Sequence, residues 1–397
     1  MALFLSLSLL SVPFAAEARI RHFKWEVKYE YKSQDCYKKL AITINGQTPG
    51  PTIKARVNDT VVVELKNSLL TENVVIHWHG IRQKGTPWFD GTAGVTQCPI
   101  VPGDTFVYKF VVDRSLLIHG KGRFNCSGLK SDLWDTTNPE CSSYVITVIP
   151  GKTYRLRIGS LTSLAALSFE IEGEAMKARQ GYILPPPQTW DRVIVTLNTQ
   201  NKINGYTRWS VNNVSYNLPD TPYLIAVKDR LNHVFDQTPP PDSYDSQNYD
   251  IFSKPNNTNA TASSSIYKLQ FNSTVDIILQ NANTMNNDNN SETHPWHLHG
   301  HDFWVLGYGK GKFDINSDQK KYNLTNPIMK NTVSVQPYGW TAIRFVADNP
   351  GVWAFHCHIE AHFYLGMGVV FEEGVEMLGR YPTSITGCGD TKGYRRP

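Results

Sequence analysis

The chain has 397 residues, of which 41% are hydrophobic, 12% aromatic and 19% charged, with a formal net charge of +4. This composition is typical of a soluble globular protein that is long enough for two or three domains. The charge is mild and no block of lysine and arginine occurs, so nucleic-acid binding has no support. Runs of β-branched and aromatic residues outnumber segments of helical periodicity, which predicts an all-β fold.

Residues 1–18 form an apolar stretch that ends in small residues, as in a secretory signal peptide. A membrane anchor is the alternative, but the stretch is short and no later segment is suited to span a bilayer. Eight Asn-x-Ser/Thr sequons also favour a secreted, glycosylated protein of the extracellular space or cell wall (apoplast). They begin at Asn58, Asn125, Asn213, Asn256, Asn259, Asn272, Asn289 and Asn323.

Short strands are expected in the N-terminal part, at residues 23–31, 40–44, 60–65 and 105–113. Between them, an apolar strand at 74–80 carries His77 and His79, which are two residues apart and therefore expected on one face. The turn-rich loop that follows contains Asp90. A histidine pair at the end of an apolar strand favours a pair of metal ligands over a chance occurrence.

Three N-terminal segments recur near the C-terminus. Residues 57–65 match 271–279, residues 76–80 match 296–300, and residues 105–113 match 341–348. The first and last parts of the chain are therefore expected to be two copies of one β-domain. The match then breaks, because Asp348 leads into a His-Cys-His strand, whereas Asp113 leads to His119 and a Gly-Lys-Gly turn. We interpret His119 as a surface or loop residue.

The middle of the chain is too short for a third sandwich of the same size. It offers one strand pair, at 143–149 and 154–158, before the proline-rich linker at 185–187. A polar loop at 236–265 is expected to be solvated. The predicted division is a signal peptide at 1–18, a first domain without its closing strands at 19–113, a remnant of a second domain and linker at 114–190, and a last domain at 191–397.

The most informative motif is His356-Cys357-His358, which ends an apolar strand and precedes a tight loop and a further strand. Alternation on a strand directs Cys357 to one side and both histidines to the other. A thiolate, imidazole and a weak thioether from Met367 are the ligands of a blue copper site, and the outward histidines can hold a second centre. The alternative is a buried cysteine flanked by core histidines.

His294, His297 and His299 supply further imidazoles. The expected blue copper ligands are His294, Cys357, His362 and Met367. The remaining imidazoles are too many for one copper and are expected to form a second cluster, from His77, His79, His297, His299, His356 and His358. Asp90 and Glu360 are candidates to orient these rings and to move protons, with an ordinary surface carboxylate as the alternative. A zinc site would not explain the Cys-to-Met spacing.

The residues after the signal peptide resemble the plant multicopper oxidases, particularly their L-ascorbate oxidase branch. The resemblance is strongest at residues 291–305 and 340–368 and clear at 204–209. It implies tandem cupredoxin domains of the Greek-key β-sandwich class, a type 1 copper that accepts electrons from an ascorbate-like reductant, and a type 2/type 3 copper cluster that reduces O2 to water. It implies neither nucleic-acid nor membrane partners, and leaves a homodimer open.

Position by position, the resemblance assigns His77 and His297 to type 2 copper. Its type 3 ligands here are His79, His299, His356 and His358. It places Trp209 and His362 at the substrate, and pairs Cys98 with Cys388 and Cys36 with Cys141, which leaves Cys126 over.

The sequence departs from that family by lacking a fourth His-x-His motif and much of the second domain. One imidazole of each type 3 copper is then missing. Three hypotheses follow: an oxidase of impaired activity, a non-catalytic cupredoxin-type copper protein, or an inactive truncated form. Of these, we expect a copper-dependent oxidoreductase.

Overall fold

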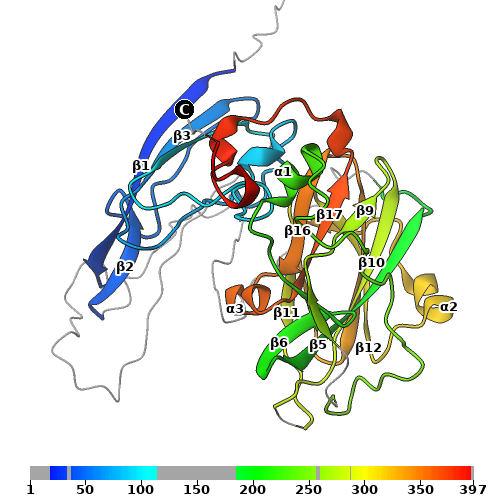
Figure 1. Cartoon of the computed structure of the whole chain (residues 1–397). Helices are drawn as coiled ribbons and strands as arrows, with labels where there is room; N and C mark the ends of the chain where they lie inside the picture. The colour runs from blue at the N-terminus through cyan, green and yellow to red at the C-terminus, as the bar shows by residue number, and fades with distance from the viewer. Residues whose placement is uncertain (1–17, 34–36, 114–184, 256–259, 287, 395–397) are drawn as a thin grey trace, which may run out of the picture.

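The structure is a computed structural model that describes residues 18–33, 37–113, 185–255, 260–286 and 288–394. The described residues form three β-sheets and a few short helices, so the all-β prediction is confirmed (Figure 1). Residues 1–17 of the predicted signal peptide, the predicted strand pair at 143–149 and 154–158, and the predicted Cys36–Cys141 disulfide lie outside the described residues. So do His119 and Cys126.

The N-terminal sheet has four strands in the order β2-β1-β3-β4. They are β1 (Ile20–Lys32), β2 (Lys39–Ile44), β3 (Thr60–Asn67) and β4 (Thr105–Val111). β1 runs parallel to β3, and the other neighbours are antiparallel. All four strands were predicted, and buried and less buried residues alternate with period two most regularly in β3 and β4.

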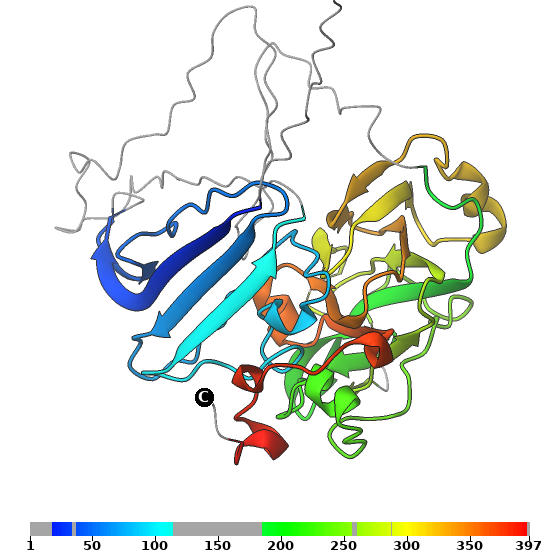
Figure 2. The same cartoon turned by 90° about the horizontal axis from the view of Figure 1, so that it is seen from above.

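One face of this sheet is buried, although no second sheet of the described residues packs against it. Trp25, Leu65 and Tyr108 from the strands pack with residues of the 68–104 connection. Ile225 of helix α1 (Tyr223–Lys228) and Ile385 of the C-terminal tail complete this core. The tail lies beside both halves of the molecule (Figures 1 and 2). This apolar face is thus covered in part by segments from the other half of the molecule.

The tail is fixed there by a disulfide. Cys98 and Cys388 are bonded across a sequence separation of 290 residues, with their Cα atoms 5.7 Å apart. The backbone N–H of Cys98 also donates to Ile385 O at 2.8 Å. This disulfide is the one that the family resemblance implied.

The C-terminal half is a sandwich of two sheets. The larger has the order β13-β12-β15-β10-β5-β6-β7-β8 and the smaller the order β14-β11-β16-β17-β9. The strands of the larger sheet are β5 (Arg192–Ile203), β6 (Tyr206–Val211), β7 (Val214–Tyr216), β8 (Thr261–Ser263), β10 (Thr274–Gln280), β12 (Phe303–Lys310), β13 (Ile328–Lys330) and β15 (Gly339–Val346). Those of the smaller sheet are β9 (Tyr267–Leu269), β11 (His294–Leu298), β14 (Thr332–Val335), β16 (Gly351–Cys357) and β17 (Gly368–Glu373).

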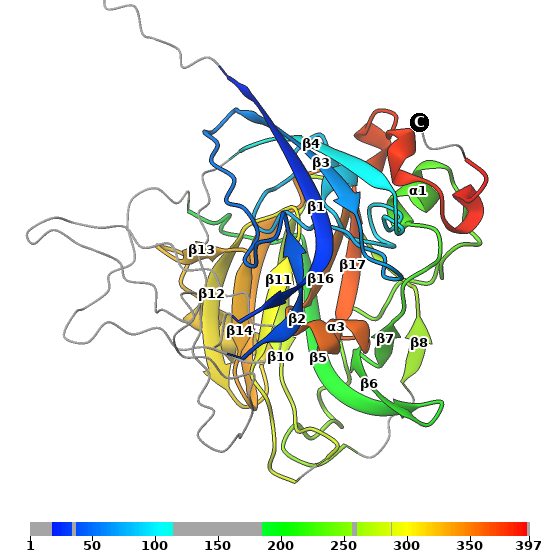
Figure 3. The ribbon, with the colours of Figure 1, turned by 90° about the vertical axis from the view of Figure 1, so that its left-hand side faces the viewer.

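The main core lies between these sheets. Ile277 and Phe345 of the larger sheet pack with Trp296, Phe355 and Cys357 of the smaller one. The short helix α3 (Glu360–Tyr364) lies at the end of β16, away from the C-terminal tail (Figures 1 and 3). Helix α2 (Ile315–Asp318) lies outside, beyond β12.

Three local predictions were wrong. Residues 74–80 do not form a strand, because the chain makes only one bridge there, between Val74 and Ile100, and then turns at Gly80. The loop after Cys357 contains α3, whose first turn is closed by Phe363 N–H donating to Ile359 O at 3.2 Å. The 236–265 loop is only partly solvated, since Ile251 packs against the sandwich and β8 forms near the loop's end.

Candidate metal centres

The register of two neighbouring strands brings the ligand residues together. β11 and β16 are antiparallel, and Trp296 lies opposite Cys357 while His297 lies opposite His356. Successive residues on β16 therefore face opposite sides of the smaller sheet. Cys357 is fully buried in the sandwich core, and His356 faces the N-terminal half. One motif thus contributes to two separate groups of side chains.

Two imidazole nitrogens and the cysteine sulfur form the first group. The Nδ1 atoms of His294 and His362 each lie 3.7 Å from Cys357 Sγ and 3.2 Å from each other. Met367 is fully buried in the same core, and its carbonyl accepts a hydrogen bond from Cys357 N–H at 3.1 Å. A Cys-His-His triangle beside a methionine is the donor set of a blue copper site.

Burial sets the protonation of this group. It raises the pKa of the Cys357 thiol to about 12, lowers that of His294 to about 3 and lowers that of His362 to about 4. Both imidazoles are therefore neutral and able to bind a metal at neutral pH. The thiolate becomes the stable form only when a cation displaces its proton. The residues therefore fit copper.

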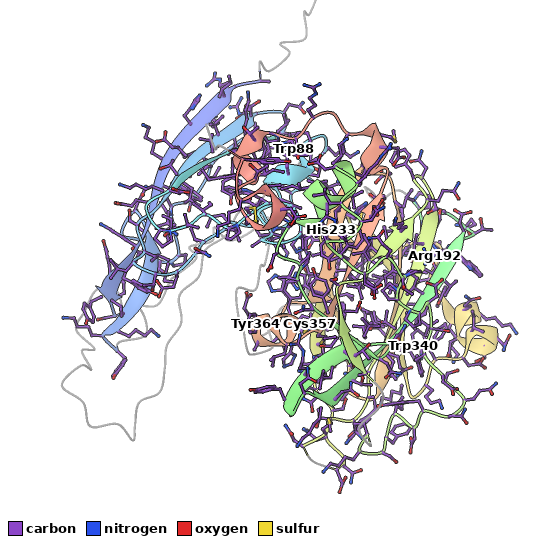
Figure 4. The ribbon with its side chains drawn as sticks, in the orientation of Figure 1. Trp88, Arg192, His233, Trp340, Cys357 and Tyr364 are labelled. Carbon is purple, nitrogen blue, oxygen red and sulfur yellow. A yellow bond between two sulfur atoms is a disulfide. The ribbon has the colours of Figure 1, made fainter. Side chains whose placement is uncertain are left out.

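The far edge of His362 is the accessible part of this site. Its Nε2 atom lies 3.7 Å from a carboxylate oxygen of Glu292, whose side chain is 44% exposed. The ring of Trp209 lies 4.8 Å from that of His362, but Trp209 is only 4% exposed. Tyr364 on α3 is 85% exposed (Figure 4). The predicted substrate residues thus meet at one end of the sandwich, with His362 and Glu292 more exposed than Trp209.

The second group lies between the two halves and begins with His77 and His297. Their Nε2 atoms are 3.4 Å apart. His77 Nδ1 donates to Asp90 O at 2.8 Å, and His297 Nδ1 donates to Asn331 O at 2.7 Å. Since a carbonyl oxygen only accepts, both Nδ1 atoms carry the proton and both Nε2 lone pairs face each other. This arrangement suits a shared cation.

His299 and His356 repeat the same arrangement. Their Nε2 atoms lie 3.0 Å apart. His299 Nδ1 donates to the Asp90 carboxylate at 2.8 Å, and His356 Nδ1 donates to Cys357 O at 2.9 Å. The carbonyl of the sulfur ligand thus fixes the tautomer of a histidine in the second group.

His79 and His358 form the third pair, with ring centroids 5.0 Å apart. His79 also stacks on His297 at 3.8 Å. The six imidazoles predicted from the sequence therefore all lie together, as three pairs. The segment of His77 and His79 is not a strand, yet both rings face this cluster.

Burial favours the neutral form of most rings in this cluster. It lowers the pKa of His79 to about 3 and that of His299 to about 4, and it lowers the pKa values of His297 and His356 well below their usual range. Burial alone would also lower the pKa of His77, but the Asp90 carboxylate beside it raises that pKa. Facing imidazole lone pairs repel one another unless a cation lies between them. The donor set therefore fits copper here as well.

The two predicted carboxylates have different environments. Asp90 is fully buried and contacts the rings of both His77 and His299. Burial alone would raise the pKa of Asp90, but these two rings hold it below its usual range. Glu360 is exposed at the start of α3, and its charge raises the pKa of His358, against the larger lowering caused by burial. Asp90 is thus in contact with two rings of the cluster, whereas Glu360 lies at the surface.

Sequence reasoning missed several neighbours of the cluster. Thr332 Oγ1 lies 3.1 Å from His297 Nδ1 and 3.4 Å from His79 Nε2. Phe363 stacks on His356 with ring centroids 4.1 Å apart. Neither residue belongs to a histidine motif, so no local pattern singled them out. The fourth histidine of the 294–301 segment, His301, was also missed and is considered below.

The sequence and the fold are both similar to those of known proteins. Three family models described as multicopper oxidase match residues 26–121, 102–178 and 233–377. The chain is 39% identical to L-ascorbate oxidase of Cucumis sativus, in an alignment of 576 positions that covers 99% of this chain and 97% of that protein. It is 38% identical to L-ascorbate oxidase of Cucurbita pepo var. melopepo, over 94% of this chain and 98% of the relative.

These alignments are longer than the 397 residues of the chain, so they place internal gaps in it. This agrees with the predicted internal deletions. Among solved structures, laccase from Botrytis aclada has a similar fold, with a TM-score of 0.66 and 19% identity over 92% of this chain and 90% of that one. The cupredoxin fold class predicted from the sequence is thereby confirmed. Within the described residues, no helix has the length and apolar character needed to cross a membrane.

Proposed function

The chain belongs to the multicopper oxidase family, and we propose that it is a secreted copper-dependent oxidoreductase that couples oxidation of ascorbate, or a similar small reductant, to reduction of O2 to water. The observation that carries this proposal is the two-sided strand end at residues 356–358. There the buried thiol of Cys357 contacts His294 on one side of the strand, and the ring of His356 contacts His299 on the other. A covalent path of a few bonds then joins the two sites.

The described residues would hold copper in four places. His294, Cys357, His362 and Met367 would hold a type 1 copper. The pair His77 and His297 would hold type 2 copper, and the type 3 pairs would be His299 with His356 and His79 with His358. When bound, copper supplies one-electron redox chemistry at the sulfur site and dioxygen reduction at the cluster.

The chain's own residues provide entry and orientation. The Nε2 edge of His362 is the part of the type 1 site that a reductant can approach. The nearby Glu292 carboxylate can accept a proton from the reductant. Trp209 packs against both His362 and His294, and so holds the exposed ligand in place. We propose that a planar reductant docks against the Nε2 edge of His362, beside Trp209.

At the cluster, buried Asp90 fixes the Nδ1–H tautomers of His77 and His299, which leaves both Nε2 atoms for metal. We propose that Asp90 and Glu360 also deliver protons to oxygen, from the inside and from the surface respectively. His77, His297 and His299 also line a small recess together with Arg82.

We further propose that activity is impaired. The sequence has 12 histidines, of which eight are in the two candidate sites. Among the described residues outside them, His22 is exposed, His233 pairs with Asp390, and His301 pairs with Glu373. None of these three is placed to complete a type 3 pair. This observation favours a second candidate function, a protein that retains only the type 1 copper and cannot reduce O2.

Oxygen uptake separates the two candidates. Copper-loaded, purified protein is given ascorbate, and O2 consumption and hydrogen peroxide are measured together. The oxidase proposal predicts slow uptake with one O2 consumed per two ascorbate molecules and no peroxide. Cys357→Ser is the matched control and should abolish it. A blue protein that is reduced by ascorbate but consumes no O2 would instead support the second candidate.

A further inference from the structure

Two turns from opposite halves of the chain are bonded to each other beside the cluster. One is the Gly80-Ile81-Arg82 segment that follows His79, and the other is Gly300, which follows His299. Arg82 Nε donates to Gly300 O at 3.1 Å. Asn349 Nδ2 donates to the same carbonyl at 2.9 Å and to Arg82 O at 2.6 Å. One amide group thus bonds to both turns.

The surroundings of Asn349 leave it little freedom. It is 1% exposed, its backbone N–H donates to Glu373 at 3.0 Å, and its carbonyl accepts from Trp353 Nε1 at 2.8 Å. Gly300 has a φ of 71°, and a Cβ there would lie 2.5 Å from the Trp353 ring. Only glycine fits this turn, so its carbonyl is fixed in direction toward Arg82 and Asn349.

Charged partners reinforce the contact on both sides. Arg82 Nη2 pairs with the carboxylate of Asp348, the residue before Asn349. Glu373, which binds the Asn349 backbone, also lies 2.8 Å from His301 Nε2, and His301 Nδ1 donates to His299 O at 3.0 Å. A series of polar contacts therefore runs from Arg82 through Asn349, Glu373 and His301 to the main chain of His299.

We propose that Arg82 and Asn349 are positioning residues that hold the His77/His79 turn and the His297/His299 turn at metal-binding separation before copper is present. The argument rests on the proposed function for its copper readout, but the contact itself consists of protein atoms alone. It joins the turn after His79 to the turn after His299. Among the described residues, the segment with His77 and His79 is the one through which the N-terminal half supplies histidines to the cluster. Because the described residues offer two imidazoles for each type 3 copper, one fewer than the family resemblance implies, fewer metal bonds would hold the two halves in register.

The test compares Arg82→Met, Arg82→Lys and Asn349→Ala with the unchanged full chain. In copper-free protein, hydrogen–deuterium exchange is measured in peptides covering residues 77–82 and 297–301. We expect exchange to rise about tenfold in Arg82→Met and Asn349→Ala, the factor expected from losing a hydrogen bond of ordinary strength. Arg82→Lys keeps the charge toward Asp348 and should restore part of the protection.

Copper is then titrated into the same proteins, and its binding is measured. Affinity at the cluster should fall about 10- to 100-fold, while the blue type 1 absorption, which arises inside the sandwich, should stay unchanged and report that the variants fold. Unchanged exchange in both Arg82→Met and Asn349→Ala would overturn the proposal. If the unchanged chain binds type 1 copper only, the proposed oxidase function fails, and the exchange result still decides whether these residues hold the turns.

Discussion

His77 Nε2 lies 3.4 Å from His297 Nε2, although the two residues are 220 positions apart in the chain. Each ring has its other nitrogen committed to a main-chain carbonyl, so the two lone pairs face one another. The contact exists because the N-terminal sheet and the C-terminal sandwich share a core and a disulfide. The candidate cluster is therefore a property of the interface between the two halves.

Removing the Asp90 carboxylate should weaken the cluster selectively. Asp90→Ala leaves the main-chain bond to His77 but loses the carboxylate bond that orients His299. Copper affinity at the cluster should fall about 10- to 100-fold, with the blue absorption unchanged. Copper titration with optical detection measures both sites. Asp90→Asn keeps the side-chain volume and one hydrogen-bond acceptor, so it should lose less copper affinity. Equal affinity in the unchanged protein and both variants would contradict an orienting role.

Glu292 should affect which reductants react well. Its carboxylate lies 3.7 Å from the outer nitrogen of His362 and repels an anionic reductant. Glu292→Gln should lower KM for ascorbate, which is an anion at neutral pH, by up to about fivefold at low ionic strength, with less effect in high salt. Steady-state kinetics with ascorbate and with a neutral phenol measure the contrast. A similar change in KM for both reductants would argue against an electrostatic effect.

Loss of the disulfide should destabilise the junction between the halves. The Cys98–Cys388 bond closes a separation of 290 residues, so on the chain-entropy model it contributes about 5–6 kcal/mol to the free energy of unfolding. Urea unfolding of Cys98→Ser, Cys388→Ser and the double variant measures this. All three should lose the same amount, because either single change removes the bond. A double variant as stable as the unchanged protein would show that core packing alone holds the tail.

Acid should weaken the N-terminal sheet through Asp59. The backbone N–H groups of Arg56 and Arg19, with the Arg21 side chain, lower the pKa of Asp59 to about 2. A carboxyl whose folded pKa lies below its unfolded value of about 3.9 stabilises the fold above that value. This contribution is lost as the pH falls from about 4 to about 2. Unfolding measured against pH should show a shallower acid loss in Asp59→Asn, and an identical slope would contradict the assignment.

The sequence predicted those features of the structure that depend on the alternation of side chains along a strand. Alternation alone placed Cys357 and His356 on opposite faces, and the four strands of the N-terminal sheet followed from the same rule. The predicted strand at 74–80 was wrong because this apolar segment does not join a sheet. Its Trp78 instead packs against Tyr108 and Phe110. The bonds of Arg82 to Gly300 and Asn349 were not predictable, since they join residues more than 200 positions apart without any shared pattern.

The most direct test of the account is stepwise copper titration of the purified full chain, followed by the blue absorption of a copper–thiolate bond and by the near-ultraviolet shoulder of a type 3 pair. We expect one tightly bound copper that produces the blue band, then weaker uptake at the three histidine pairs with the shoulder appearing last. Cys357→Ser should lose the first step and keep the later ones. Copper uptake without a blue band in the unchanged chain would contradict the assignment of Cys357, His294 and His362 to a type 1 site.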